Sequence, residues 1–252
     1  GHKCDVLIGN RERDLTAGIE EADPDLIGFS VMSNDHNWLL ENVRTVKAKF
    51  PRKKIIVGGV HASVCPELIE NENIDMVCIC EGEMPLLNLL DRIERKEDYS
   101  DIKGLYVKES GRIIRNEVEA PIQNLDEVPD DRRIYINKYP HFKNDEVIQY
   151  ASSRGCLFNC SFCINEVFNR MYRGKGKRLR QKSVDMILKE LRSAREIQPG
   201  AGTIFFADDL FLSDKKFYAE FAPRFKAEIN LPYLINGFPF YIDDNVARLM
   251  KE

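Results

Sequence analysis

The sequence predicts an α/β protein made of a doubly wound domain followed by the first three βα units of a barrel. Over residues 4 to 100, short apolar runs alternate with segments of helical periodicity. Nearly continuous apolar strands between helices are typical of a parallel sheet covered on both faces. Over residues 147 to 252, three further βα units of about thirty residues each follow one another, as in a barrel.

The strands of the first domain are predicted from four apolar runs, over residues 4–10, 25–32, 53–60 and 75–80. Helical patterns follow these runs at residues 14–22, after residues 34–35, at 66–72 and across 86–93. Asp14 is placed to cap the first helix, and Asn34 or Asp35 the second. Apolar residues at helical spacing indicate the buried faces of the second and fourth helices, namely Leu39, Val43, Val46 and Phe50, and Leu86, Leu90 and Ile93.

The second part of the chain opens with two alternating runs around residues 109–111, which predict a β-hairpin. A proline-rich stretch, residues 119–140, then predicts an ordered linker. Strands follow over residues 147–153, 202–208 and 232–238, and helices open at Ser183, after Ser213 and Asp214 (with Phe217, Phe221 and Phe225 on one face), and near Asp243. We therefore divide the chain into a first domain (1–100), a hairpin and linker (101–146) and a barrel half (147–252).

Charge and cysteine content limit the function classes. The chain has 252 residues, a formal charge of −4 and a pI near 5.8, which give no general attraction to nucleic acid or to an anionic membrane. No apolar run approaches the roughly 18 residues of a membrane span. Seven cysteines, an odd number, favour a reducing compartment such as the cytoplasm. Because the chain starts at Gly1 and stops within an amphipathic pattern, we expect a fragment of a longer protein.

Three cysteines lie close together in RGCLFNCSFC, residues 154–163, with the spacing Cys156-x3-Cys160-x2-Cys163. Structural zinc takes four protein ligands, and a fourth would have to come from His141 or a distant cysteine. A [4Fe–4S] cluster held by three cysteines leaves one iron open to a substrate or cofactor. The spacing, in a polar loop after a strand, therefore favours a cluster over zinc.

This loop closely resembles the signature of the radical S-adenosylmethionine (SAM) enzymes, including the preceding Ser-Ser-Arg-Gly and the aromatic Phe162 before the last cysteine. The resemblance implies a partial (β/α)6 barrel and a cluster on Cys156, Cys160 and Cys163. It also implies that the open iron is chelated by SAM, which is cleaved reductively to a 5′-deoxyadenosyl radical. Phe162 would shield the cluster and lie near the adenine, or would only anchor the loop.

The second barrel strand ends in FFADDLF, residues 205–211, with two adjacent carboxylates. Adjacent residues on a strand point to opposite sides, so at most one of Asp208 and Asp209 faces the barrel mouth. Radical SAM enzymes bind the SAM amino group at this strand end, often through Gly-Gly-Glu. The pair departs from that run but resembles the Asp-Asp form of cobalamin-associated members. The resemblance implies that Asp208 contacts the amino group and that Asp209 caps a helix or supports the site; alternatively both are capping residues.

Three strand ends of the first domain, residues 29–35, 57–63 and 80–90, resemble the cobalamin-binding domain that precedes the barrel in many radical SAM enzymes. The carboxyl ends of parallel strands form the ligand-binding edge of such sheets. The resemblance implies an incomplete flavodoxin-like domain that lacks its first strand and helix. The residues it assigns to cobalamin are Ser30, Ser33, Gly58 and Gly59 at the nucleotide tail, with His61 in the same loop, and Gly82 and Glu83 in the next loop. For His61 we expect hydrogen bonding rather than cobalt ligation.

The resemblances imply a cobalamin-dependent radical SAM enzyme, a methyltransferase that acts on an unactivated carbon or phosphorus centre of a small-molecule substrate. The alternatives are a cyclase or rearrangement enzyme with the same parts, a methylthiotransferase, and a non-catalytic corrinoid carrier or sensor. A carrier needs no cysteine loop. A methylthiotransferase needs a second cluster, and Cys4, Cys65 and Cys78 do not match its motifs.

A run of seven Lys or Arg without an acid, residues 170–182, follows the cysteine loop. A solvated loop explains most runs of this kind. The functional alternatives are a dock for an acidic electron donor such as flavodoxin or a ferredoxin-type protein, a cradle for a phosphate-bearing substrate, and an RNA site.

Overall fold

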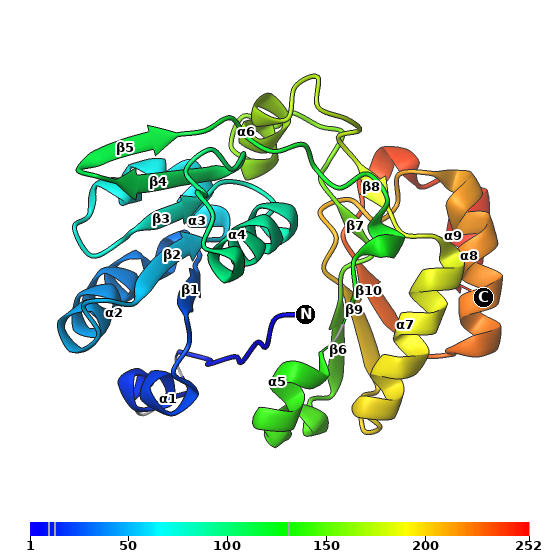
Figure 1. The fold of residues 1–252 in the computed structure, drawn as a ribbon. Helices are drawn as coiled ribbons and strands as arrows, with labels where there is room; N and C mark the ends of the chain where they lie inside the picture. The colour runs from blue at the N-terminus through cyan, green and yellow to red at the C-terminus, as the bar shows by residue number, and fades with distance from the viewer. Residues whose placement is uncertain (10, 13, 131, 252) are drawn as a thin grey trace. The chain divides into compact units, whose positions relative to one another are not determined.

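The protein consists of two compact units, residues 1–121 and residues 122–252 (Figure 1). The computed structural model describes every residue of the chain except 10, 13, 131 and 252. In both units, parallel strands alternate with helices. Among the described residues, no helix is both long enough and apolar enough to cross a membrane.

The first unit is built on a five-stranded sheet with the strand order β1-β2-β3-β4-β5. The strands β1 (Leu26–Ser30), β2 (Lys54–Gly58) and β3 (Met76–Cys78) are parallel, and β4 (Leu105–Glu109) and β5 (Arg112–Arg115) add an antiparallel hairpin. The helices are α1 (Leu15–Ala22), α2 (His36–Lys49), α3 (Val60–Val64) and α4 (Glu83–Arg95), with short 3-10 turns η1 (Ser33–Asp35) and η2 (Pro66–Glu70). The predicted α/β fold and the predicted hairpin are thus confirmed.

The capping residue predicted for α1 and most of the buried face predicted for α2 are confirmed. The Asp14 carboxylate caps α1 by accepting hydrogen bonds from the backbone N–H groups of Thr16 at 2.8 Å and Ala17 at 3.3 Å. Three of the four residues predicted to face the core from α2 are buried, namely Leu39, Val43 and Val46. The fourth, Phe50, is only partly buried and stands at the C-cap of the helix.

The buried face predicted for α4 is partly wrong. Ile93 packs against the core as predicted, but the buried positions before it are shifted by one residue. Pro85 and Leu89 are buried, whereas Leu86 is 39% exposed. Apolar residues occupy four consecutive positions from 84 to 87, so periodicity alone does not select a face. The face is set by the sheet, because Leu89 joins a core cluster with Ile56 of β2 and Met76 of β3.

The strand predicted over residues 4–10 is also wrong. Residues 4–8 have no regular secondary structure, and residue 10 lies outside the described residues. Leu7 packs against Gly18 of α1, and Gly9 lies against the ring of Trp38 in α2. The segment therefore packs on helices at Leu7 and Gly9, and its described residues form no ladder with β1.

The second unit contains three parallel strands, β6 (Val147–Tyr150), β9 (Thr203–Phe206) and β10 (Tyr233–Ile235), in the order β10-β9-β6. Three helices follow them, α7 (Val184–Ile197), α8 (Lys215–Glu228) and α9 (Asp244–Lys251). Ser183 caps α7 and Asp214 caps α8 through their side chains. Ile204 and Phe206 of β9 are buried in one core with Phe221 of α8. The three predicted βα units are confirmed.

The segment predicted as a linker, residues 119–140, begins at the end of the first unit, and its described residues from 122 on belong to the second unit. It includes η3 (Leu125–Glu127), α5 (Arg133–Lys138) and η4 (Pro140–Asn144). The Asp126 carboxylate accepts a hydrogen bond from the backbone N–H of Ser183 at 2.8 Å, so η3 is tied to the start of α7. The remaining short elements are β7 (Ser153–Arg154), which pairs antiparallel with β8 (Arg180–Gln181), α6 (Ile164–Met171) and η5 (Pro239–Tyr241).

Candidate cofactor site

The three predicted cluster ligands lie in the loop between β7 and α6, which follows the carboxyl end of strand β6. All three are free thiols: Cys156 is buried, Cys163 is partly buried and Cys160 is exposed. The backbone N–H of Cys163 donates to the carbonyl oxygen of Cys160 at 2.9 Å, which forms a tight turn between the last two cysteines. The loop thus carries thiols that range from buried to exposed.

Asn169 of α6 holds the cysteine loop in place. Its buried side-chain amide donates to the carbonyl oxygens of Cys156 and Phe158, both at 3.1 Å, and lies 3.0 Å from Oδ1 of Asn159. Sequence reasoning missed this residue, because nothing in its spacing from the cysteines marks it. One side-chain amide, which has two hydrogens to donate, therefore holds a loop that has no ladder of its own.

Gly155 brings the loop against β8. Its φ is +86°, and a Cβ added there would lie 2.0 Å from the carbonyl oxygen of Arg178. The left-handed φ and the close backbone approach both require glycine at this position.

The three sulfur atoms are not grouped as the ligands of one zinc ion would be. Thiolates around one zinc at about 2.3 Å are roughly 3.8 Å apart. In the described part of the chain, the three cysteines are not a group with all ligand atoms within 4.8 Å of one another. Burial first, and then the charges of Asp209, Cys163 and Cys160, raise the pKa of Cys156. Thiolates of a cluster bind different irons, so their sulfur atoms need not meet at one metal ion.

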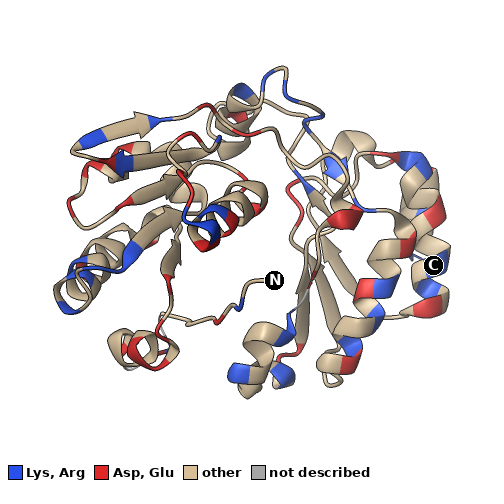
Figure 2. Ribbon diagram, in the orientation of Figure 1, with Lys and Arg blue, Asp and Glu red and all other residues tan. Residues whose placement is uncertain are grey.

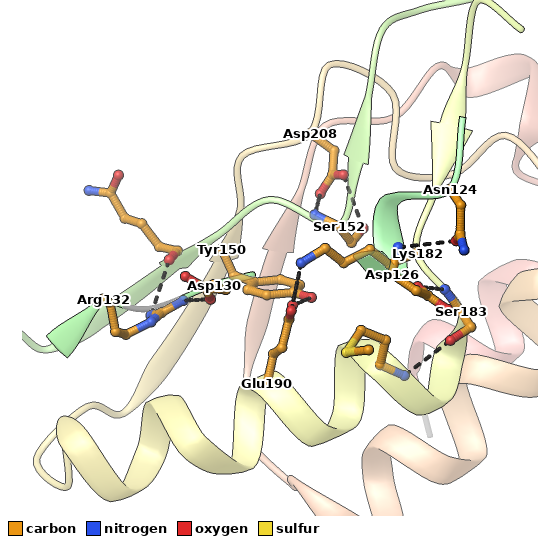
Figure 3. Close-up of polar contacts among 12 residues, drawn as sticks. Asn124, Asp126, Asp130, Arg132, Tyr150, Ser152, Lys182, Ser183, Glu190 and Asp208 are labelled. Atoms are coloured by element: carbon orange, nitrogen blue, oxygen red, sulfur yellow. Dashed lines mark hydrogen bonds and ion pairs between the residues drawn. The ribbon is translucent and has the colours of Figure 1, made fainter. Parts of the chain in front are cut away.

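The two aspartates after β9 differ in burial, and Figure 3 shows the contacts of Asp208. Asp208 is 1% exposed, and its carboxylate accepts hydrogen bonds from the backbone N–H (3.2 Å) and Oγ (3.0 Å) of Ser152 and from Oγ of Ser153. Burial raises the pKa of Asp208 although these hydrogen bonds lower it. Asp209 is exposed, and its charge acts on Cys156. The expected cap on α8 is Asp214 and not Asp209.

A second polar network joins β6 to α7 (Figure 3). Lys182 and Glu190 of α7 form a buried ion pair at 2.6 Å, and the Tyr150 hydroxyl donates to the same carboxylate at 2.5 Å. Burial and the Glu190 carboxylate raise the pKa of Tyr150. Arg180 is buried as well, and its Nη1 donates to the carbonyl oxygen of Ile122 at 2.9 Å. Two members of the basic run are therefore structural.

Phe162 does not cover the cluster loop in this structure, because it is 92% exposed. Phe158 takes the packing role instead. Its ring centroid lies 4.6 Å from that of Phe238 and 6.2 Å from that of Tyr241. The hydrophobic anchor of the loop is therefore Phe158.

In the first unit, the loops after β1 and β2 meet at the carboxyl edge of the sheet. The backbone N–H of Val31 donates to the carbonyl oxygen of Gly58 at 3.2 Å. Gly59 has a φ of +89°, and a Cβ there would lie 2.7 Å from the backbone of Val31. Ser30 and Ser33 are exposed at this edge. Gly59 therefore serves the close approach of two loops, and Ser30 and Ser33 are left accessible.

His61 is buried and engaged in hydrogen bonds at both ring nitrogens. Its Nε2 lies 2.8 Å from Nδ1 of His36, and its Nδ1 lies 3.1 Å from Oγ of Ser33. Burial first, and the neighbouring charge of His36 second, lower the pKa of His61, while Glu67 raises it. These contacts support the hydrogen-bonding role over cobalt ligation.

The loop after β3 completes the edge. Gly82 is partly buried and stands at the N-cap of α4, and Glu83 is exposed. Burial, followed by Cys80 and Glu83, raises the pKa of Cys78 to about 12. A buried, protonated Cys78 does not suit the second cluster of a methylthiotransferase.

Sequence reasoning missed an apolar rim on this edge. Met32, Val60 and Met84 follow the ends of β1, β2 and β3, and they are 61%, 37% and 44% exposed. Their positions at three adjacent strand ends are the signal that could have identified them. A rim of this kind suits a large, flat, partly apolar ligand.

Two family models match the chain. Residues 1–90 match the B12 binding domain, and residues 150–252 match the Radical SAM superfamily. An uncharacterized methyltransferase of Pyrococcus horikoshii is 31% identical over 263 residues, which cover 100% of this chain and 55% of the relative. The chain spans about half the length of the curated relatives it matches.

Two solved structures share the fold. The cobalamin-dependent S-adenosylmethionine radical enzyme OxsB matches with a TM-score of 0.72 and 21% identity, over 90% of this chain and 32% of that chain. The radical S-adenosylmethionine methyltransferase TsrM from Kitasatospora setae matches with a TM-score of 0.72 and 18% identity, over 96% of this chain and 49% of that chain.

Proposed function

We propose that this chain, which belongs to the radical SAM superfamily and carries a B12-binding domain before its barrel, is the cofactor-binding part of a cobalamin-dependent methyltransferase. The substrate is a small molecule with an unactivated carbon or phosphorus centre. The observation that carries the proposal is the loop between β7 and α6, where three free thiols follow the first barrel strand. A relative named a methyltransferase supports the choice of reaction.

Cys156, Cys160 and Cys163 would hold the cluster, and the edge of the first sheet would hold cobalamin. When bound, the cluster supplies the electron that breaks a carbon–sulfur bond of SAM, and cobalamin supplies a carrier for the methyl group. The chain's own residues position the thiols. Asn169 fixes the carbonyl groups of the loop from which the thiols project.

For SAM, we propose Asp209 rather than Asp208 as the contact of the amino group. Asp209 is the exposed carboxylate and lies within electrostatic reach of Cys156. Asp208 already accepts three hydrogen bonds from Ser152 and Ser153. Phe162, which is exposed in the same loop, stays the proposed neighbour of the adenine.

For cobalamin, we propose contacts from the accessible residues of the strand ends. Ser30, Ser33 and Glu83 are exposed there, and Gly58, Gly59 and Gly82 leave room for a bulky group. His61 would act through Ser33, to which its ring is hydrogen-bonded. The apolar rim of Met32, Val60 and Met84 would contact the ligand as well.

The electron would come from a flavodoxin or ferredoxin-type protein.

The seven cysteines of the sequence are free thiols, which is typical of a reducing compartment. A cytoplasmic location is therefore part of the proposal.

Product analysis of the anaerobically reconstituted full-length protein tests the function. We expect about four iron and four sulfide per chain, and reductant-dependent formation of 5′-deoxyadenosine from SAM. Methyl transfer must also leave S-adenosylhomocysteine, whereas a cyclase or rearrangement enzyme would not form it. A variant with Cys156, Cys160 and Cys163 replaced by Ala should form neither product. Stoichiometric zinc without labile sulfide would contradict the proposal.

A pair of variants tests the SAM contact. Asp209→Asn should weaken SAM binding about tenfold to a hundredfold, since a charge-assisted hydrogen bond contributes roughly 1.5–3 kcal/mol. Asp208→Asn should leave SAM affinity within about twofold but lower thermal stability, because an amide cannot accept all three hydrogen bonds. The measurement is a SAM titration of the reduced cluster, with a thermal melt of each variant. If Asp208→Asn is the variant that loses affinity, the assignment to Asp209 is wrong.

A further inference from the structure

One strongly charged segment has no role in the proposed site. The basic loop, residues 173–178 with the sequence RGKGKR, connects α6 to β8 and contains four cations and no acid. Figure 2 shows Lys and Arg along this loop and no Asp or Glu within it. The chain as a whole has a formal charge of −4, so this positive surface is a local feature.

The cations of the basic loop differ from their neighbours in the same run. Arg170 pairs with Glu166 at 2.5 Å, and Lys182 pairs with Glu190. Arg173, Lys177 and Arg178 are exposed and Lys175 is partly exposed. Among the residues that the structure describes, none of these four forms an ion pair with an acidic side chain. Their charge is therefore available to a partner.

The basic loop lies directly against the cysteine loop. Nη1 of Arg178 is 3.4 Å from Oδ1 of Asn159, and the carbonyl oxygen of Arg178 faces Gly155. The antiparallel pairing of β7, which leads into the cysteine loop, with β8, which follows the basic loop, holds the two loops next to each other. Asn159 and Cys160 are exposed, so a protein bound on the basic loop would come close to the cluster ligands.

We propose that the basic loop is the docking surface for a small acidic one-electron donor protein. The inference rests on the proposed function, because an electron donor is needed only if the cysteine loop holds a cluster that can be reduced. Weak electron-transfer complexes bury little surface, and complementary charge guides the two proteins together and raises the association rate. The basic loop is short and rich in glycine, and its exposed or partly exposed cations form no ion pairs with acidic side chains among the described residues, so they can attract an acidic partner that binds transiently.

Two other polyanions fit the observations less well. A phosphate group is usually held by converging, partly buried donors, whereas these cations are spread along an exposed segment, and Gly174 has no heavy atom within 4 Å of a built Cβ. A nucleic-acid-binding domain typically has a pI above about 9, and this chain has a pI near 5.8. Both remain as outcomes of the test.

The test compares two reductants on the full-length protein with its cluster reconstituted. The variant carries Arg173→Glu, Lys175→Glu and Lys177→Glu, and it keeps Arg178 because that side chain contacts Asn159. The matched control carries Lys189→Glu, Lys216→Glu and Lys226→Glu on α7 and α8, which changes the net charge by the same amount. Cluster reduction is followed optically with dithionite and with reduced flavodoxin.

We expect the rate constant for reduction by flavodoxin to fall about tenfold or more in the basic-loop variant at low salt. The rate with dithionite and the iron content should match those of the wild type, and the control should behave as wild type with both reductants. Salt at about 0.15 M and above should slow the wild type toward the variant.

Equal flavodoxin rates in the variant and the control would overturn the inference while leaving the proposed function intact. A variant that keeps the flavodoxin rate but loses binding of inorganic phosphate or single-stranded RNA would assign the loop to those ligands. A wild-type protein that assembles no reducible cluster would overturn the proposed function and the inference together.

Discussion

Replacing Gly155 with Ala tests whether the close contact between the cysteine loop and β8 positions the thiols. The φ of +86° costs a residue with a Cβ roughly 1–2 kcal/mol. The new Cβ would also lie 2.0 Å from the carbonyl oxygen of Arg178, whereas ordinary contact begins at 3.4 Å. The two segments must then separate by about 1.4 Å, which is enough to break ladder hydrogen bonds between β7 and β8. Two lost bonds cost about 1 kcal/mol each, so the total is about 3 kcal/mol.

The assay has two readouts, the iron and sulfide content after anaerobic reconstitution and the thermal unfolding of the metal-free protein. For a unit of this size, about 3 kcal/mol lowers Tm by roughly 10 °C. We expect Gly155→Ala to retain less than about half of the wild-type iron content at a temperature where the metal-free protein is still folded.

Gly174→Ala is the matched control. Gly174 has a similar φ of +75°, but a Cβ there meets nothing within 4 Å. This variant should lose only about 1 kcal/mol and keep its full iron content. If Gly155→Ala and Gly174→Ala retain the same iron content, the contact with β8 does not position the thiols, and the reasoning is refuted.

Two further predictions concern the first unit. Because the pKa of His61 is lowered mainly by burial and then by His36, the stability of its neutral form is present above pH 6.5 and is lost as the pH falls through the lowered pKa. Thermal melts between pH 5 and 8 should therefore show less acid destabilisation for His61→Gln than for the wild type, and equal curves would contradict this. Gly82→Arg should reduce cobalamin retained per chain while sparing the iron content, with Gly200→Arg as control, where a Cβ meets nothing. If Gly82→Arg retains its cobalamin, the proposed position of the cobalamin site is wrong. Gly59 is not suitable for this test, because a substitution there would also disrupt its close contact with the backbone of Val31.

The order of strands and helices could be predicted because its signals are local. Apolar runs predict all six parallel strands of the two units, and the caps Asp14, Ser183 and Asp214 act through their own first turns. The three cysteines are equally local, since their spacing in one loop suffices to suggest a cluster. These features depend on residues a few positions apart.

The features that could not be predicted depend on partners far away in the sequence. Residues 4–10 have the composition of a strand, but a strand also needs a ladder partner, and this segment packs on helices instead. Strand alternation predicts that Asp208 and Asp209 face opposite sides, but not which of the two is buried. That choice is made by Ser152, more than fifty residues earlier in the chain.

Asp208 shows how the barrel and the cysteine loop are joined into one support. Its carboxylate receives hydrogen bonds from Ser152 and Ser153, at the point where β6 leads into β7 and the loop. Its backbone carbonyl accepts a hydrogen bond from Asn236, just after β10, at 3.0 Å. One residue at the end of β9 thus links the carboxyl ends of all three barrel strands. Because Asn169 secures the same loop from α6, the thiols are positioned from two sides by groups that are not themselves ligands, as a preorganised site requires.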